Sequence, residues 1–184
     1  VGLFALLMIV CIIALCAGQY SVSVFEVIKI LASRFVNVTK TWNNTAEGVV
    51  FTLRLPRIIG AVLVGSALSL SGAAYQGVFQ NPLVAPDLLG VSSGACVGAS
   101  VAILLHLNSF GVQAMAFGAG ILAVGLTIFI PHLIRNTNMT MLVLSGIIVK
   151  GIMDSVMGII KYVADPETEL QSITYWQLGS LTKV

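Results

Sequence analysis

Two ionisable residues lie within a long apolar run of the sequence. Lys150 and Asp154 stand four residues apart within the predominantly apolar run from Met141 to Val163. Charged side chains in such a run usually face a bundle interior or a watery cavity, because lipid does not solvate them. Two interpretations stay open: the side chains line a path for a transported substrate, or they neutralise each other one helical turn apart.

The sequence shows no catalytic or metal-binding pattern. His106 and His132 are isolated, and the cysteines Cys11, Cys16 and Cys96 lie in apolar segments without a CxxC pair. A metal site or an activated nucleophile needs several suitable side chains together. We therefore expect that the chain is not an enzyme, and that it binds neither a metal ion nor a cofactor of its own.

The elements that must position these residues are membrane helices. Hydrophobic residues make up 58% of the chain and charged residues 9%, and Asp87 is the one formal charge between Arg57 and Arg135. An uncharged run of that length belongs in lipid, which we expect as a partner of the chain. The net charge of +2 gives no reason to expect a nucleic-acid partner.

Five apolar stretches are predicted to cross the membrane, with the start of a sixth span near Val184. The predicted spans are about 1–18, 58–80, 88–107, 111–133 and 141–163. The loop 19–53 carries an amphipathic pattern, and Trp42 in it fits an interfacial anchor. The fold class is therefore an all-α, polytopic transmembrane helix bundle, with residues 1–184 forming a single domain.

Small residues recur along two of these spans at the spacing of one helix face. Ala61, Gly65, Ser69, Ala73 and Gly77 form one ridge in the second span, which we expect to lie at the centre of the bundle. The third span has a similar ridge. Such ridges let helix backbones approach closely, although glycine and alanine are also simply common in membrane helices. The glycines predicted to serve packing are Gly65, Gly72, Gly90, Gly94 and Gly98.

The stretch from Arg54 onward resembles a known family. It reads R-L-P-R-I and then G-x-x-Y-Q-G-V-F-x-N-P-L-x-x-P-x-x-L-G-V-S-S-G-A, with further similarity at Leu142–Ile147 and Tyr175–Leu181. These motifs are similar to those of FecCD-type permeases of ABC importers, which carry ferric siderophores, haem or cobalamin. The resemblance implies a permease of roughly ten spans, of which this chain is the amino-terminal half.

The resemblance also implies partners and a location. A second permease subunit, identical or a close paralogue, completes the pathway in the inner cell membrane. A cytoplasmic ABC ATPase uses the ATP, and an extracytoplasmic substrate-binding protein delivers the ligand. Arg54 and Arg57 match family arginines that dock this protein, although they could instead only anchor a helix end. Asn138, Met139 and Thr140 match the family's cytoplasmic gate.

Two points stay open. The resemblance places the loop 19–53 outside, whereas the positive-inside rule favours the opposite, since that loop carries Lys29, Arg34 and Lys40. The alternative function is an ion-coupled secondary transporter that uses Lys150 and Asp154 as a charge relay. Such a transporter would need no partner ATPase.

Overall fold

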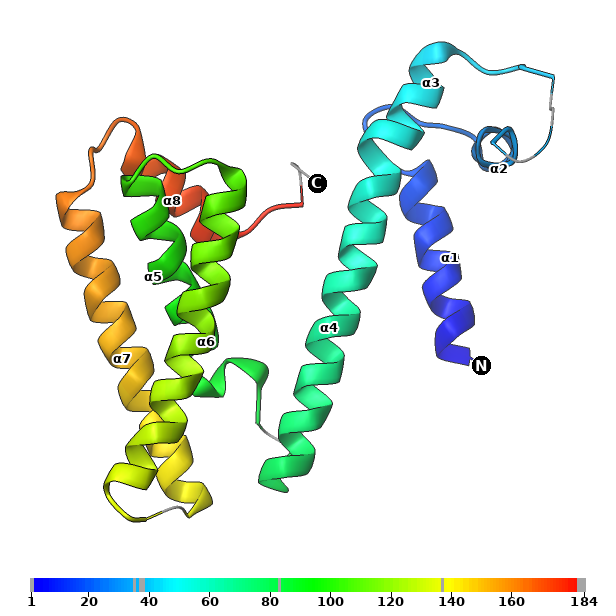
Figure 1. Cartoon of the computed structure of the whole chain (residues 1–184). Helices are drawn as coiled ribbons and strands as arrows, with labels where there is room; N and C mark the ends of the chain where they lie inside the picture. The colour runs from blue at the N-terminus through cyan, green and yellow to red at the C-terminus, as the bar shows by residue number, and fades with distance from the viewer. Residues whose placement is uncertain (1, 35, 37–38, 83, 137, 182–184) are drawn as a thin grey trace. The chain divides into compact units, whose positions relative to one another are not determined.

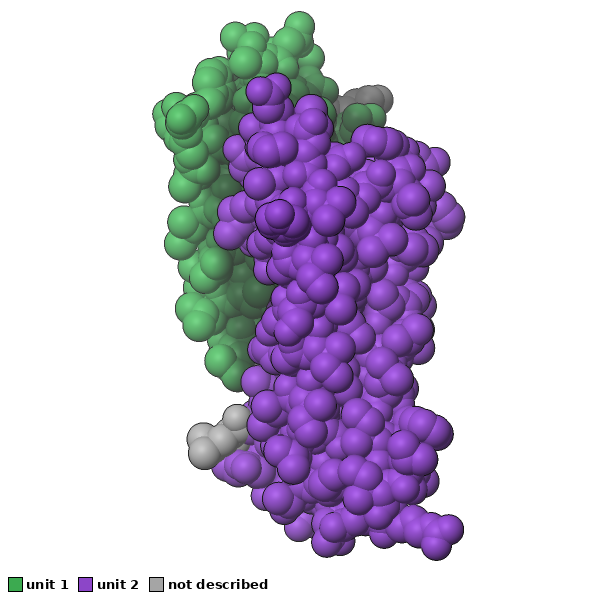
Figure 2. Space-filling view, turned by 90° about the vertical axis from the view of Figure 1, so that its left-hand side faces the viewer, with its two compact units in different colours: residues 1–67, 181–184 green, residues 68–180 purple. Residues whose placement is uncertain are grey.

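The computed structural model describes residues 2–34, 36, 39–82, 84–136 and 138–181, and those residues form helices and connections without a β-strand (Figure 1). They fall into two compact units (Figure 2). Unit 1 comprises residues 1–67 with 181–184, and unit 2 comprises residues 68–180. The single transmembrane domain expected from the sequence stays a prediction.

Unit 1 is built on short helices packed around the start of a long one. Its helices are α1 (Gly2–Cys16), α2 (Val24–Ala32), α3 (Asn44–Gly48), the π-helical segment η1 (Val49–Arg54) and the first part of α4 (Leu55–Phe79). Ser23 and Glu26 form a capping box at the start of α2, which satisfies backbone amides that the helix leaves free. The apolar face of α2 contributes the buried Val27 and Ile30 to a small core.

Trp42 belongs to this core, and its predicted place at a membrane interface stays a prediction. Its side chain is buried against Val27, Ile30 and Val50. The indole N–H donates a hydrogen bond to Glu47 Oε2 at 3.3 Å, and the same oxygen accepts from Lys40 Nζ at 2.7 Å. Such a site suits an indole, because its apolar body packs in the core while its N–H bonds a polar partner.

The segments α3, η1 and α4 run as one continuous helix of 36 residues from Asn44 to Phe79. At about 1.5 Å per residue the helix is longer than the apolar core of a bilayer, about 30 Å. The helix begins at Asn44, well before residue 58, where the sequence predicted the start of the span. The π-helical turns end beside Pro56, whose missing amide hydrogen interrupts the regular bonding pattern.

Unit 2 contains the end of α4 followed by a helical hairpin and two further helices. Its elements are the 3₁₀ segment η2 (Pro86–Leu89), α5 (Val91–Leu104), α6 (Ser109–Leu133), α7 (Met139–Val163) and α8 (Glu169–Leu178). Asn108 caps α6 by accepting a hydrogen bond from the Gly111 amide at 2.8 Å. Helix α5 packs against both α6 and α7 (Figure 1).

The helices depart from the sequence predictions at two further places. Three helices of the described chain are long and apolar enough to cross a membrane, namely residues 44–79, 109–133 and 139–163, while α1 and α5 are shorter apolar helices. The third predicted span is replaced at its start by η2, so that α5 has 14 residues. The connection expected at 165–180 contains α8, and the end of the chain at 182–184, where a sixth span was expected to begin, lies outside the described residues.

The two small-residue ridges behave differently in the chain. Gly94 packs against α6, where an added Cβ atom would lie 2.5 Å from Ala123 Cβ and 2.9 Å from the Ala119 carbonyl oxygen. An added Cβ atom at Gly98 would likewise collide with α6. By contrast, α4 buries no residue, and a Cβ atom at Gly65 would meet none of the described atoms within 4 Å. The central position expected for the second span is therefore not formed by the described residues alone.

Candidate functional site

The segment η2 is held between α6 and α7 by close backbone contacts. Thr127 on α6 is fully buried and donates a hydrogen bond from Oγ1 to the Leu89 carbonyl oxygen at 3.1 Å. A Cβ atom at Gly146 on α7 would collide with the Leu88 carbonyl oxygen. At Gly90 (φ 72°), which admits the left-handed turn into α5, an added Cβ atom would lie 3.3 Å from the Lys150 amide nitrogen.

This packing lies well within the length of α7. Gly146 and Lys150 are seven and eleven residues after Met139, or about 10 and 16 Å along the helix at 1.5 Å per residue. Non-helical backbone is tolerated at membrane depth only where protein or an aqueous cavity satisfies it. The contacts from α6 and α7 meet that requirement for η2.

An ion pair joins η2 to α7. Lys150 Nζ donates to Asp87 Oδ2 at 2.6 Å, although the two residues are 63 positions apart in the sequence. The side chains are 45% and 40% exposed, respectively. The local interpretation, in which Lys150 and Asp154 neutralise each other, is therefore wrong about the bonded partner. Asp154 is exposed and lies within electrostatic range of Lys150 without accepting its hydrogen bond.

Helix α7 carries its charges on one face. Lys150, Asp154 and Lys161 follow one another at spacings of four and seven residues, which places them on the same side of a helix. A Cβ atom at Gly151 or Gly158, beside these charges, would meet nothing within 4 Å. The exposed apolar residues lie on another side and include Ile148, Ile152, Ile159 and Val163. We call the side with Lys150, Asp154 and Lys161 the charged face of α7.

The charged face continues toward α8, where Lys161 Nζ donates to Gln177 Oε1. A second contact links α8 to the end of α5, since His106 Nε2 lies 3.4 Å from Glu169 Oε1. Neither contact was predicted, because both depend on a helix in a segment that was expected to be a polar connection. A membrane helix with a face of this kind requires water or protein beside it, not lipid.

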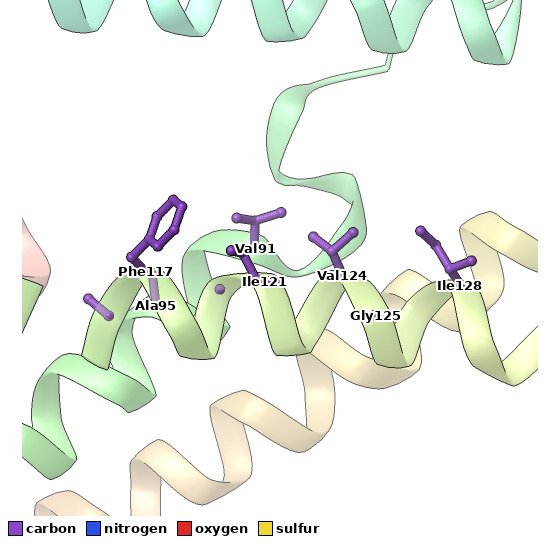
Figure 3. Close-up of a pocket in the computed structure, with 9 residues that line it drawn as sticks. Val91, Ala95, Phe117, Ile121, Val124, Gly125 and Ile128 are labelled. Carbon is purple, nitrogen blue, oxygen red and sulfur yellow. The ribbon is translucent and has the colours of Figure 1, made fainter. Parts of the chain in front are cut away.

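Unit 2 also holds an apolar groove of about 460 Å³ between α5 and α6 (Figure 3). Phe117, Val91, Val124 and Ile128 stand along it, and its lining has no charged side chain. Such a groove suits hydrocarbon or another apolar helix face, since no polar group in it would orient a polar ligand. The groove and the charged face are therefore chemically distinct surfaces.

The two arginines predicted to dock a partner have different surroundings in unit 1. Arg54 Nη1 donates to the Leu15 and Cys16 carbonyl oxygens at 2.6 and 3.1 Å, and Nη2 donates to the Tyr20 carbonyl oxygen. These contacts close the carboxyl end of α1, whose last carbonyls have no partner within the helix. Arg57 is exposed, and the described residues give it no ion pair. Both arginines line a hollow of about 490 Å³ within unit 1.

The residues predicted to form a gate lie at the turn between α6 and α7. Asn138 is the N-cap of α7, and its amide donates to Asn136 Oδ1 at 3.4 Å. Met139 and Thr140 begin the helix and are exposed. Their exposure leaves them free to contact a further segment or subunit.

The comparison with known proteins identifies the family. The FecCD transport family matches residues 6–184, which is nearly the whole chain. The chain belongs to the FecCD transport family. It spans about half the length of the curated relatives that it matches along nearly its whole length.

FecCD relatives with different named cargoes resemble the chain to a similar degree. The molybdate import system permease protein MolB of Haemophilus influenzae is 36% identical over 181 residues, covering 97% of the chain and 52% of MolB. The vitamin B12 import system permease protein BtuC of Pectobacterium atrosepticum is 31% identical over 183 residues, covering 99% of the chain and 51% of BtuC. The hemin transport system permease protein HmuU of Yersinia pestis is 36% identical over 152 residues, covering 76% of the chain and 44% of HmuU.

A solved structure shares the fold. It is described as an inward-facing conformation of a transporter of the metal-chelate ABC type. The TM-score is 0.81 at 32% identity, and the match covers 98% of the chain and 53% of the solved chain. The helix arrangement of the chain is therefore similar to that of about half of a chain in this transporter structure.

Proposed function

We propose that the full-length protein is the membrane-spanning permease subunit of an ATP-driven importer of metal chelates or related ligands. The observation that carries this proposal is the match to the FecCD family over residues 6–184. The similarity to a transporter described as of the metal-chelate ABC type supports the same function. In this function the chain catalyses no reaction, and its conformations respond to partners that each prefer one state.

The partners follow from that function. A second permease subunit completes the path, an ABC ATPase supplies the energy of ATP hydrolysis, and an extracytoplasmic binding protein delivers the ligand. We place the docking of the binding protein at Arg57, because its guanidinium is exposed and can pair with a carboxylate. Arg54 supports this surface from behind by closing α1.

We place the path of the transported ligand along the charged face of α7. Lys150 and Asp154 lie on that face with open space at Gly151 and Gly158 beside them. The turn at Asn138, Met139 and Thr140 lies at the end of the same helix and forms the cytoplasmic gate. A path beside α7 gives the charges the aqueous surroundings that lipid would deny them.

Uptake by cells with and without the full-length gene tests this function. Cells that also produce the binding protein and ATPase are given labelled ferric siderophore, haem, cobalamin or molybdate. We expect uptake of one ligand to require the permease and to disappear when the phosphate-binding lysine of the ATPase is replaced. Uptake that survives loss of the ATPase and stops when the proton gradient is dissipated would instead show an ion-coupled secondary transporter.

A further inference from the structure

The charged face of α7 contains one feature that an aqueous path alone does not require. Its ammonium group at Lys150 is bonded to a carboxylate from a different segment, Asp87 on η2. The backbone around this pair is fixed, because Gly90 packs against the Lys150 amide and Gly146 packs against Leu88. Asp87 is therefore held in place, and it holds the Lys150 ammonium in turn.

The pair is open on one side. Lys150 is 45% exposed, and its ammonium has three N–H donors, of which Asp87 takes one. The hydrogen bonds of the described residues supply no other acceptor for this group. Donors left free at this position of a membrane helix require a polar neighbour. The open side of Lys150 therefore faces either the path or whatever moves along it.

Asp87 weakens the hold of the Lys150 ammonium on an anion. An isolated ammonium in a narrow path would hold an anion firmly, whereas passage requires binding that is weak enough to release. The carboxylate cancels the net charge while leaving free N–H donors. A neutral pair of this kind can hydrogen-bond an oxygen-rich ligand without trapping it.

We propose that Lys150, kept neutral as a pair by Asp87, is a cargo-binding group that donates hydrogen bonds to oxygen-rich anions. This inference rests on the proposed function. Asp87 is a positioning residue, since it acts through Lys150. The shared ligand chemistry is an anionic surface of oxygen acceptors, which either a small oxyanion or an anionic metal chelate presents.

The test uses the full-length permease assembled with its ATPase and reconstituted in proteoliposomes with its binding protein. The probes are molybdate for the oxyanion and ferric citrate for the anionic chelate. Two quantities are measured for each probe: the Kd for the purified permease–ATPase complex without the binding protein, and the maximal rate of ATP-driven uptake. The variants are Lys150→Met, Asp87→Asn and the double variant Asp87→Asn with Lys150→Gln.

The expected results separate binding from release. Lys150→Met raises the Kd of the imported probe roughly tenfold, because the hydrogen-bond donors are lost and the Asp87 carboxylate is left without its partner. Asp87→Asn lowers the Kd while slowing uptake several-fold, because an uncompensated ammonium retains the anion. The double variant keeps a neutral, hydrogen-bonding pair, and its Kd returns to within about threefold of the wild-type value.

Lys40→Met is the matched control, because Lys40 also bonds a carboxylate, Glu47 at 2.7 Å, but belongs to unit 1, whereas α7 belongs to unit 2. It should leave Kd and uptake rate unchanged. Wild-type import of a probe with Kd values that none of the three variants alters would overturn the inference and leave the proposed function intact. Wild-type import of only a cargo without anionic oxygens would also overturn the inference and leave the proposed function intact. Failure of the wild type to import any ligand with an intact ATPase would overturn the proposed function itself.

If Lys150→Met does not assemble, the double variant decides, because it replaces both charges without leaving either one unpaired. A folded double variant with a Kd raised tenfold or more would show that charge, and not hydrogen bonding, binds the cargo. That outcome also overturns the inference. Size-exclusion chromatography of each variant establishes whether it is folded.

Discussion

Single arginine side chains near a helix end can serve the protein's own backbone or a partner, and Arg54 illustrates the first case. Its guanidinium donates to carbonyl oxygens at Leu15, Cys16 and Tyr20, which belong to the end of α1 and the residues after it. Gly18 permits this approach, because a Cβ atom there would lie 2.5 Å from Arg54 Nη2. The arginine therefore fixes the chain as it leaves α1.

The two neighbouring arginines yield contrasting predictions. Replacing Arg54 by Gln removes charge-assisted hydrogen bonds and should lower the stability of the full-length protein by about 1–3 kcal/mol. Replacing Arg57 by Glu should leave stability unchanged and weaken docking of the binding protein, more strongly at low salt because screening is then weaker. Thermal unfolding in detergent measures the first effect, and the salt dependence of the docking Kd measures the second.

Arg54→Lys is the matched control for stability, since lysine keeps the charge but cannot reach several carbonyls with one planar group. It should recover only part of the loss. Equal unfolding temperatures for Arg54→Gln and Arg57→Glu would contradict the division of roles between the two residues. An unchanged docking affinity for Arg57→Glu would remove Arg57 from the docking surface.

At the scale of elements, the contact of α5 with α6 depends on small residues on both helices. Gly94 and Gly98 face Ala119 and Ala123 so closely that the helices have no room for a further methyl group. Gly118 on α6 is different, because a Cβ atom there would meet nothing within 4 Å of the described chain. The same residue type therefore serves packing at one position and leaves a surface open at another.

Alanine substitution separates these two uses of glycine. Gly94→Ala should destabilise the protein by about 1–3 kcal/mol, because its methyl group overlaps α6. Gly118→Ala serves as the control and should be neutral or slightly stabilising, since alanine favours a helix by up to about 1 kcal/mol over glycine. The midpoints of thermal unfolding, followed by size-exclusion chromatography, measure both changes. A Gly94→Ala protein as stable as the wild type would show that the α5–α6 contact is looser than described.

The elements also show how far sequence reasoning reaches. Helices α6 and α7 begin and end within two residues of the spans predicted at 111–133 and 141–163, because each is a long apolar run. The helix α8 was missed, because its mixed composition resembles that of a connection. The segment η2 was read as the start of a span, because its conformation is set by contacts with Thr127 and Gly146 that lie far along the chain.

The candidate site was predictable only in part. Lys150 and Asp154 stood out as charges in an apolar run, but the bonded partner of Lys150 is 63 positions away. One signal could have suggested this partner. Asp87 is the sole formal charge between Arg57 and Arg135, so a counter-ion for it had to come from another segment. The spacing of charges within α7 alone cannot identify a bonded partner on another segment.

At the scale of the whole molecule, the open question is which side of the membrane each connection faces. Helices α4, α5 and α6 lie between Asn44 and Asn136, and three crossings would place these two residues on opposite sides. Helix α5 has only 14 residues, or about 21 Å, which is less than the apolar thickness of a bilayer. The 3₁₀ segment η2 must supply the remaining depth if α5 is to cross the membrane.

Cysteine labelling of the full-length protein in intact cells shows on which side of the membrane Asn44 and Asn136 lie. With Cys11, Cys16 and Cys96 replaced by serine, single cysteines are introduced at the exposed positions Asn44 and Asn136. We expect a membrane-impermeant thiol reagent to label Asn44→Cys in intact cells and Asn136→Cys only after the cells are opened. This result would place Lys29, Arg34 and Lys40 outside, against the usual distribution of positive charge, and would agree with docking at Arg57. Labelling of both positions in intact cells would mean that α5 enters and leaves the membrane on one side, and the turn at Asn138 could not then be the cytoplasmic gate.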